Sequence, residues 1–198
     1  MNTARYTGQA TDKGTTSASL NFGGNPGGGS PHTTDICESW NGTSWTEVND
    51  LNTAREAVSG FGTTSAAAAV GGKTPSVTDA AEEWNGTSWT EVGDLNTART
   101  QSSGTGTVTA ALASGGTTGS LTGVTETYNG STWTETEDMN TGRGDAASAG
   151  TTTAALAAGG DTGSVSAVSE EFNGTAWAEG NDLNTAYNSK MYPVDSNF

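Results

Sequence analysis

Arginine is the residue whose spacing in this chain most invites a chemical interpretation. Every arginine of the 198 residues falls in one slot of a repeated motif, and the last three are 44 residues apart (Arg5, Arg55, Arg99 and Arg143). A ring of guanidinium groups could bind an anionic ligand, because each group offers a planar fork of donors. A slot shared by every copy is better explained by the scaffold. We therefore expect each arginine to pair with a carboxylate or with backbone carbonyls between repeats.

Acidic and amide residues close each repeat and could hold a hard cation (Asn49-Asp50, Gly93-Asp94, Glu137-Asp138 and Asn181-Asp182). Calcium needs roughly six to eight oxygen ligands that converge from a loop. No stretch of the sequence has the alternating acidic spacing of such a loop. We expect a solvated edge at these positions, with no metal site and no cofactor.

One short stretch combines groups that could form a nucleophile or a metal site, namely His32, Asp35 and Cys37. The sequence has one histidine and one cysteine. Multi-histidine metal sites and disulfides within the chain are therefore excluded, and a Cys-His pair would lack an obvious orienting group. Cys37 fits a buried strand position instead, so we expect no catalytic residue. A hydrolase with a rim site would have to use the least repetitive carboxylates, which are Glu56, Asp145 and Asp161.

The loop from Gly24 to His32 is the irregular feature of an otherwise strict repeat, being four residues longer than its counterparts. Loops that depart from a repeat are common places for function. Neutral drift in a loop rich in glycine and proline is the alternative. The candidate binding residues in this loop are Asn25, Pro26 and His32.

These residues belong to four near-copies of one motif (Trp40 to Arg55, Trp84 to Arg99, Tyr128 to Arg143 and Phe172 to Tyr187). Such a period indicates stacked supersecondary units, none of which can bury its apolar faces alone. One repeat divides into predicted strands at 56–62, 66–70, 77–84 and 88–92. Glycines and β-branched residues interrupt every candidate helix of useful length. We predict an all-β chain in which each repeat is a four-stranded antiparallel sheet.

The pair Asn85-Gly86 predicts the hairpin between the third and fourth strands. Asn-Gly is favoured in two-residue type I′ turns, in which both positions need a positive φ. That turn would place Trp84 opposite Thr87 and make Trp84 and Trp89 a diagonal pair on one face. We assign a structural role to the tryptophan of each fourth strand (Trp45, Trp89, Trp133 and Trp177).

The formal charge of −15, from 22 acidic and 7 basic residues, limits the partners. Nucleic-acid binding needs lysine and arginine to displace counterions from phosphates, so we expect no nucleic acid. No apolar run approaches the roughly 18 residues of a membrane span, and the first residues carry no apolar signal segment. We expect synthesis in a cytoplasm, no signal peptide and no membrane.

The repeats resemble the kelch repeats of β-propellers. The matching features are a glycine pair after the second strand, an aromatic residue in the third, a tryptophan in the fourth and a Leu/Met-x-x-x-Arg exit. The resemblance implies a β-propeller of four kelch-like four-stranded antiparallel blades (about 5–55, 55–99, 99–143 and 143–187). The 44-residue repeat is shorter than the roughly 50 residues usual for kelch, so its loops must be tight.

Two arrangements of four blades stay open: a ring that closes within one chain, or arcs that join into a larger ring. We favour the single-chain ring, because the strands expected at its axis contain almost nothing bulky (66–69, 110–111 and 154–155). The tail 188–198 is expected to clasp the ring or contact a partner, with Tyr192 and Phe198 as anchors.

Acidic, threonine-rich kelch-like repeats of this style also resemble those of virion and tail-associated proteins of bacteriophages, notably marine ones. That resemblance implies a non-enzymatic structural or interaction module located in the virion, as a capsid decoration or a tail- or fibre-associated protein. Its partners would be other virion or scaffold proteins and a host surface glycan, and a homo-oligomer is compatible with this role. A carbohydrate-binding or adhesive propeller is the second hypothesis for the function, and a hydrolase with a rim site is the third.

Overall fold

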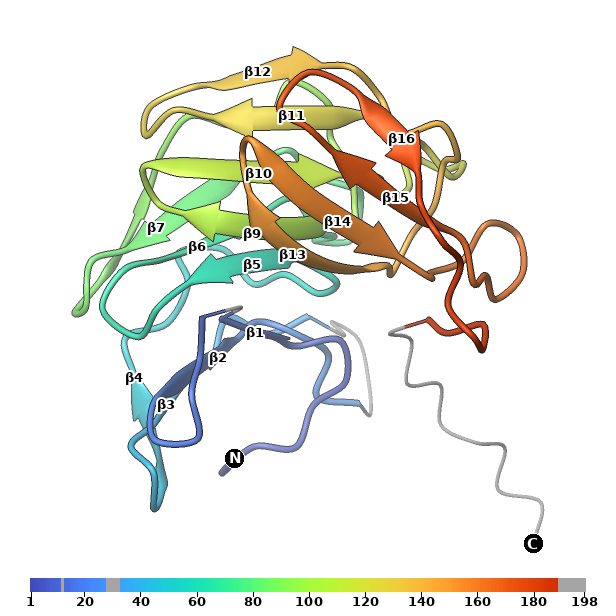
Figure 1. Ribbon diagram of the computed structural model, residues 1–198. Coiled ribbons are helices and arrows are strands. Elements are labelled where there is room, and N and C mark those ends of the chain that lie inside the picture. Colours follow the sequence, from blue (N-terminus) through green and yellow to red (C-terminus); the bar gives the residue numbers. More distant parts are fainter. Residues whose placement is uncertain (12, 28–32, 189–198) are drawn as a thin grey trace, which may run out of the picture.

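The computed structural model describes residues 1–11, 13–27 and 33–188. The regular secondary structure of the described residues consists of β-strands alone. These strands form four four-stranded antiparallel sheets. Each sheet is a meander, in which strands that follow one another in sequence are paired (Figure 1). No described segment forms a helix that is long and apolar enough to cross a bilayer. The predicted all-β class and the architecture of four propeller blades are confirmed.

The four sheets are the blades, numbered in chain order. The first blade contains β1 (Gln9–Ala10), β2 (Ser19–Phe22), β3 (Cys37–Trp40) and β4 (Trp45–Val48). The second contains β5 (Ser59–Gly62), β6 (Ala67–Val70), β7 (Ala81–Trp84) and β8 (Trp89–Glu91). The third contains β9 (Ser103–Thr107), β10 (Ala110–Ser114), β11 (Thr125–Tyr128) and β12 (Trp133–Thr136). The fourth contains β13 (Ala147–Thr151), β14 (Ala154–Ala158), β15 (Ser169–Phe172) and β16 (Trp177–Glu179).

The first strand of each blade lies at the centre, where β5 packs on β1 and β9, and β9 packs on β13 (Figure 1). Just before β5, β9 and β13, a backbone hydrogen bond joins the blade to the preceding blade. Ala57 N donates to Thr7 O over 3.2 Å, Gln101 N to Ala57 O over 3.0 Å, and Asp145 N to Gln101 O over 2.9 Å. All four residues have a positive φ of 50 to 60°, which is uncommon outside glycine. The same conformation therefore recurs at each step around the centre.

The alanine-rich strands do not lie at the centre, so the reason given for favouring a single-chain ring is wrong. Strands β6, β10 and β14 are second from the inner edge of their sheets. The innermost strands β5 and β9 achieve their close approach through glycine. A Cβ atom on Gly60 would meet the ring of Phe22 and the side chain of Gln9, and one on Gly104 would lie 3.1 Å from the ring of Phe61.

The hairpin between the third and fourth strands differs from the predicted two-residue turn. Trp84 lies directly opposite Trp89, so four residues make the connection and the predicted diagonal pairing is wrong. Positive φ occurs at Gly86 and not at Asn85. The Asn85 Oδ1 atom accepts hydrogen bonds from Thr87 N at 2.9 Å and Ser88 N at 3.0 Å. The asparagine therefore closes the turn with its side chain rather than with a left-handed backbone.

All four strands predicted for this repeat begin later than expected, and the first and third differ most. The predicted strands 56–62 and 77–84 start at Ser59 and Ala81. Glu56 and Val77 instead make isolated bridges, both to Lys73. The residues before each strand therefore tie the loop between the second and third strands to the start of the blade.

The hydrophobic core lies between blades rather than within one of them. The cluster between the first and second blades contains Leu20 and Phe22 from one side and Trp84 and Trp89 from the other. Phe22 and Trp89 meet edge to face, with ring centroids 4.9 Å apart. Equivalent clusters join the second blade to the third and the third to the fourth. Each blade is therefore stabilised mainly by its neighbours, as expected for stacked units.

Candidate functional site

The four repeated arginines are buried in ion pairs with the glutamates of the third strands. The N–O distances are 3.1, 2.9, 3.2 and 2.6 Å (Arg5–Glu38, Arg55–Glu82, Arg99–Glu126 and Arg143–Glu170). All eight side chains are at most 1% exposed. An anion-binding ring would need guanidinium groups that reach solvent. The geometry therefore supports the structural interpretation of these arginines.

Arg55 shows how each guanidinium is held. It donates to the backbone carbonyls of Gly71 at 3.0 Å and Ala80 at 2.5 Å, as well as to the Glu82 carboxylate. Desolvation lowers the pKa of Arg55, and the negative charge of Glu82 opposes this shift. The pairing follows from burial, since a buried charge needs both an opposite charge and hydrogen bonds.

The linker between blades is fastened to the same glutamate. Asn52, between the first and second blades, donates from its backbone N and its Nδ2 to Glu82 over 2.7 and 2.9 Å, and its Nδ2 also donates to Trp89 O. The same contacts recur at Asn96 and Asn140. Glu82 and its equivalents therefore bind the preceding linker and the following sheet together.

The structural tryptophans assigned from the sequence occupy equivalent positions. Trp89, Trp133 and Trp177 are buried between blades, whereas Trp45 is only half-buried. Trp84 and Trp89 have ring centroids 5.5 Å apart on one face of their blade. The buried aromatics are interface residues and offer little surface to a ligand.

The acidic residues at the ends of the repeats have a role that the sequence analysis missed. Asp50, Asp94 and Asp138 each accept a hydrogen bond from the first backbone N–H of a third strand, at 2.9, 3.1 and 3.2 Å. Their constant spacing of 13 residues from the donor was the available signal. Among the described residues no group of three His, Cys, Asp or Glu side chains could hold a metal ion.

The irregular loop of the first blade is described in part. Asn25 pairs with Tyr6 through backbone hydrogen bonds of 2.7 Å, and its Nδ2 donates to Glu56 at 2.9 Å. Pro26 is exposed, and the neighbouring Tyr6 side chain is 56% exposed. His32 lies outside the described residues, as does the predicted tail from 189 to 198 with Tyr192 and Phe198. Tyr6, Asn25, Pro26 and Glu56 are thus neighbours through these contacts, and we name them the first-blade patch.

The reactive groups considered from the sequence are engaged elsewhere. Cys37 is buried, and desolvation raises the pKa of its thiol to about 12. The Asp145 carboxylate accepts a hydrogen bond from Gln101 at 2.8 Å, and Asp161 accepts one from Gly163 N at 2.8 Å. With Glu56 bound to Asn25, the three carboxylates make separate hydrogen bonds, and none of them lines either of the two grooves described next.

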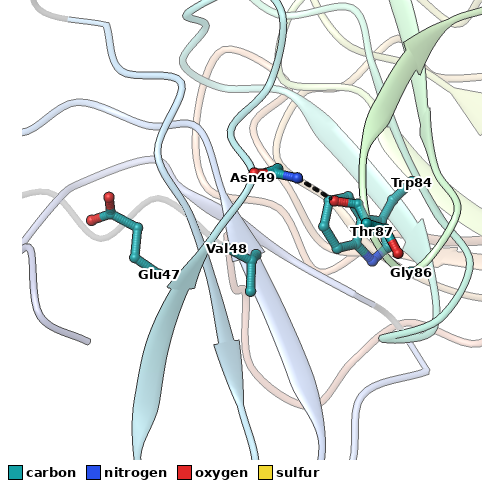
Figure 2. Close-up of a pocket in the computed structure, with 6 residues that line it drawn as sticks. All are labelled: Glu47, Val48, Asn49, Trp84, Gly86 and Thr87. Atoms are coloured by element: carbon teal, nitrogen blue, oxygen red, sulfur yellow. Dashed lines mark hydrogen bonds between the residues drawn. The ribbon is translucent and has the colours of Figure 1, made fainter.

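A groove opens at the outer rim between the first and second blades (Figure 2). It has a volume of about 400 Å³ and is lined by Glu47, Val48, Asn49, Trp84, Gly86 and Thr87. Asn49 spans it, because its Nδ2 donates to Thr87 O at 2.7 Å. A smaller groove lies beside Trp133. Both grooves are shallow, and the sequence analysis singled out neither.

Comparison of the chain with models of protein families gave no match, and comparison with curated proteins gave none.

Proposed function

We infer that the protein is a non-enzymatic interaction module that uses its blade rims and faces as docking surfaces. One observation carries this inference: the arginines and glutamates common to the repeats are buried in ion pairs, and the aromatic pairs of the second, third and fourth blades are buried between blades. The repeated charged and aromatic residues thus stabilise the fold. What remains for a partner is an acidic surface with a net charge of −15, shallow grooves and the first-blade patch.

At a finer level we propose a kelch-like component of a bacteriophage virion, as capsid decoration or tail- or fibre-associated protein that contacts other virion proteins or the host surface. The kelch-like and phage-like style of the repeats supports this proposal. Mass spectrometry of purified particles tests it: the protein should co-purify with particles at a fixed ratio to the capsid protein. Recovery only as free protein in the lysate contradicts the proposal.

The first-blade patch favours glycan binding as a second candidate function. An exposed tyrosine beside amide and carboxylate groups suits a sugar, since the ring can stack on it and the polar groups can bind its hydroxyls. Glycan-array binding that Tyr6→Ala abolishes and Tyr187→Ala preserves would support this candidate. Tyr187 is a matched control, because it is 52% exposed against 56% for Tyr6. Silence of the wild type across the array rejects the candidate for the sugars tested.

A further inference from the structure

Each internal blade interface joins a largely aliphatic side of one blade, to which Phe22 and Phe61 add a ring at the first two interfaces, to an aromatic pair on the next blade. Leu20 of the first blade packs in one cluster with the aromatic pair of the second. Leu112 of the third blade packs in one cluster with Phe172 and Trp177 of the fourth. At the interface between the second and third blades, Ala68, Val70 and Leu95 of the second blade lie in one cluster with Tyr128 and Trp133 of the third, and Phe61 packs beside them. One mode of contact thus occurs three times in the chain.

The fourth blade leaves its aliphatic side exposed. Leu156, which is equivalent to Leu112, is 41% exposed, whereas Leu112 is 1% exposed. Leu183, which is equivalent to the buried Leu51 and Leu95, is 38% exposed. We name the surface formed by Leu156 and Leu183 the aliphatic face. Its side chains are those that a following blade covers elsewhere in the chain.

The first blade leaves the complementary side uncovered. Trp40 and Trp45 are the equivalents of the buried pair Trp84 and Trp89, yet both are half-buried. Their ring centroids are 5.5 Å apart, as in the second blade, so the pair is already arranged for contact. We name the surface formed by Trp40 and Trp45 the aromatic face.

We propose that the aliphatic face of one chain docks on the aromatic face of a second copy of the same chain. The contact continues the three internal interfaces with the same residue types on the same sides. It is heterologous, since two different surfaces meet, and such contacts form closed rings or open rows according to their rotation. Two chains closed in this way would form a ring of eight blades, within the usual range of about four to eight.

The polar contacts that a preceding blade makes elsewhere to the third-strand glutamate are made at Glu38 by residues of the first blade itself. Asn2 donates to Glu38 and to Trp45 O, and Arg5 forms the buried ion pair with Glu38. These contacts match those that Asn52 and Arg55 bring from a preceding blade. A docking chain must therefore supply only the apolar contacts.

Residues 184–187 of the docking chain would approach the position that Asn2 and Arg5 occupy. Tyr187 stands in the arginine slot, so no second guanidinium would be driven against Glu38. The segment is exposed, and Tyr187 is held to its own blade by two backbone hydrogen bonds, from Tyr187 N to Ser166 O and from Gly160 N to Tyr187 O. Docking therefore requires these two hydrogen bonds to break, so that the segment moves while the aliphatic face stays in place.

The first test is the mass of the purified 198-residue chain in solution. We expect about 40 kDa, twice the 19.9 kDa of one chain, or a higher multiple. Because each copy carries a net charge of −15, association should strengthen with salt. A mass of 19.9 kDa at every salt and protein concentration overturns the proposal.

Two substitutions test which faces meet. Leu156→Glu and Trp40→Lys should each give a chain of 19.9 kDa, because each destroys one face of every contact. Leu121→Glu is the matched control, since Leu121 is 37% exposed but belongs to the third blade, which carries neither face. This control should keep the wild-type mass. Far-UV circular dichroism of all three variants reports whether the blades remain folded.

Mixing the two variants distinguishes head-to-tail contact from pairing of like faces. Leu156→Glu chains keep the aromatic face and Trp40→Lys chains keep the aliphatic face, so an equimolar mixture should form a pair of about 40 kDa through one native contact. A variant that still pairs with itself, or a mixture that stays at 19.9 kDa, overturns the proposal. These measurements use pure protein alone, so their failure leaves the virion proposal standing and the two are tested separately.

Discussion

Removing the charge of Glu82 tests the idea that the repeated ion pairs hold the blades together. Glu82 is 1% exposed and accepts four hydrogen bonds, from Asn52 N and Nδ2, Thr53 N and Arg55 Nη2. In Glu82→Gln either orientation of the amide turns its NH₂ group toward some of these donors. The substitution therefore leaves the buried Arg55 guanidinium without a counter-charge, and it places the amide NH₂ group against the N–H donors that now bind the carboxylate.

The expected loss follows from the burial of the pair. Removing one partner of a buried ion pair destabilises a protein by about 3–5 kcal/mol. The loss of two hydrogen bonds to a charged group, at about 1.5–3 kcal/mol each, gives a similar figure. Because domains unfold with about 5–15 kcal/mol, Glu82→Gln should remove a large part of the stability of the chain.

Urea unfolding followed by tryptophan fluorescence measures this loss, and a matched control lies in the same hairpin. Glu91 pairs directly with Glu82 in the strand register but is exposed. Glu91→Gln should therefore change the free energy of unfolding by no more than about 0.5 kcal/mol. If Glu82→Gln is no less stable than Glu91→Gln, the buried ion pairs do not hold the blades and the argument for them fails.

Three further expectations concern the core and the turns. Burial raises the pKa of the Cys37 thiol from 9.0 to about 12. The contribution of the neutral thiol to the free energy of unfolding is therefore complete below pH 9 and is lost as the pH rises toward 12. The wild type should thus lose about 2 kcal/mol relative to Cys37→Ala between pH 9 and 11, and parallel urea midpoints would count against this. Trp89→Ala should lower the free energy of unfolding by about 3–5 kcal/mol, because Trp89 is 5% exposed. Trp45→Ala should lower it clearly less at concentrations where the chain is monomeric, because Trp45 is half-buried. Equal losses of stability in the two variants would contradict this expectation. Gly71→Ala should destabilise by at least about 1 kcal/mol more than Gly119→Ala, because both glycines have positive φ but only at Gly71 would the new Cβ collide, with the carbonyl of Arg99; thermal melts that coincide would refute this.

The architecture could be predicted from the sequence because the repeat supplies the same information four times. A period of 44 residues with glycine pairs and aromatics in fixed slots leaves few alternatives to stacked four-stranded sheets. The boundaries of strands were less predictable. Lys73 bridges both Glu56 and Val77 without continuing a strand, and no periodic signal in the sequence separates such a bridge from a ladder.

The hairpin register was missed for a local reason. Asn-Gly favours a two-residue turn when asparagine itself adopts a positive φ. Here the Asn85 side chain caps the backbone of Thr87 and Ser88 instead, which lengthens the turn and brings Trp84 opposite Trp89. Composition alone cannot distinguish these two uses of asparagine, because both place the same dipeptide at the same point of a hairpin.

The candidate site was harder to predict than the fold, since interface residues and surface residues share one sequence pattern. Leu112 and Leu156 occupy the same slot and have the same side chain, yet one is 1% and the other 41% exposed. The difference arises only from what packs against each blade. Equivalent positions in a repeat therefore act as internal controls. Where one copy is more exposed than its equivalents, we expect a partner with the chemistry of the neighbour that covers the other copies. The neighbour that covers Leu112 is the aromatic pair Phe172 and Trp177, and the half-buried Trp40 and Trp45 of the first blade form the equivalent pair that our proposal places against Leu156.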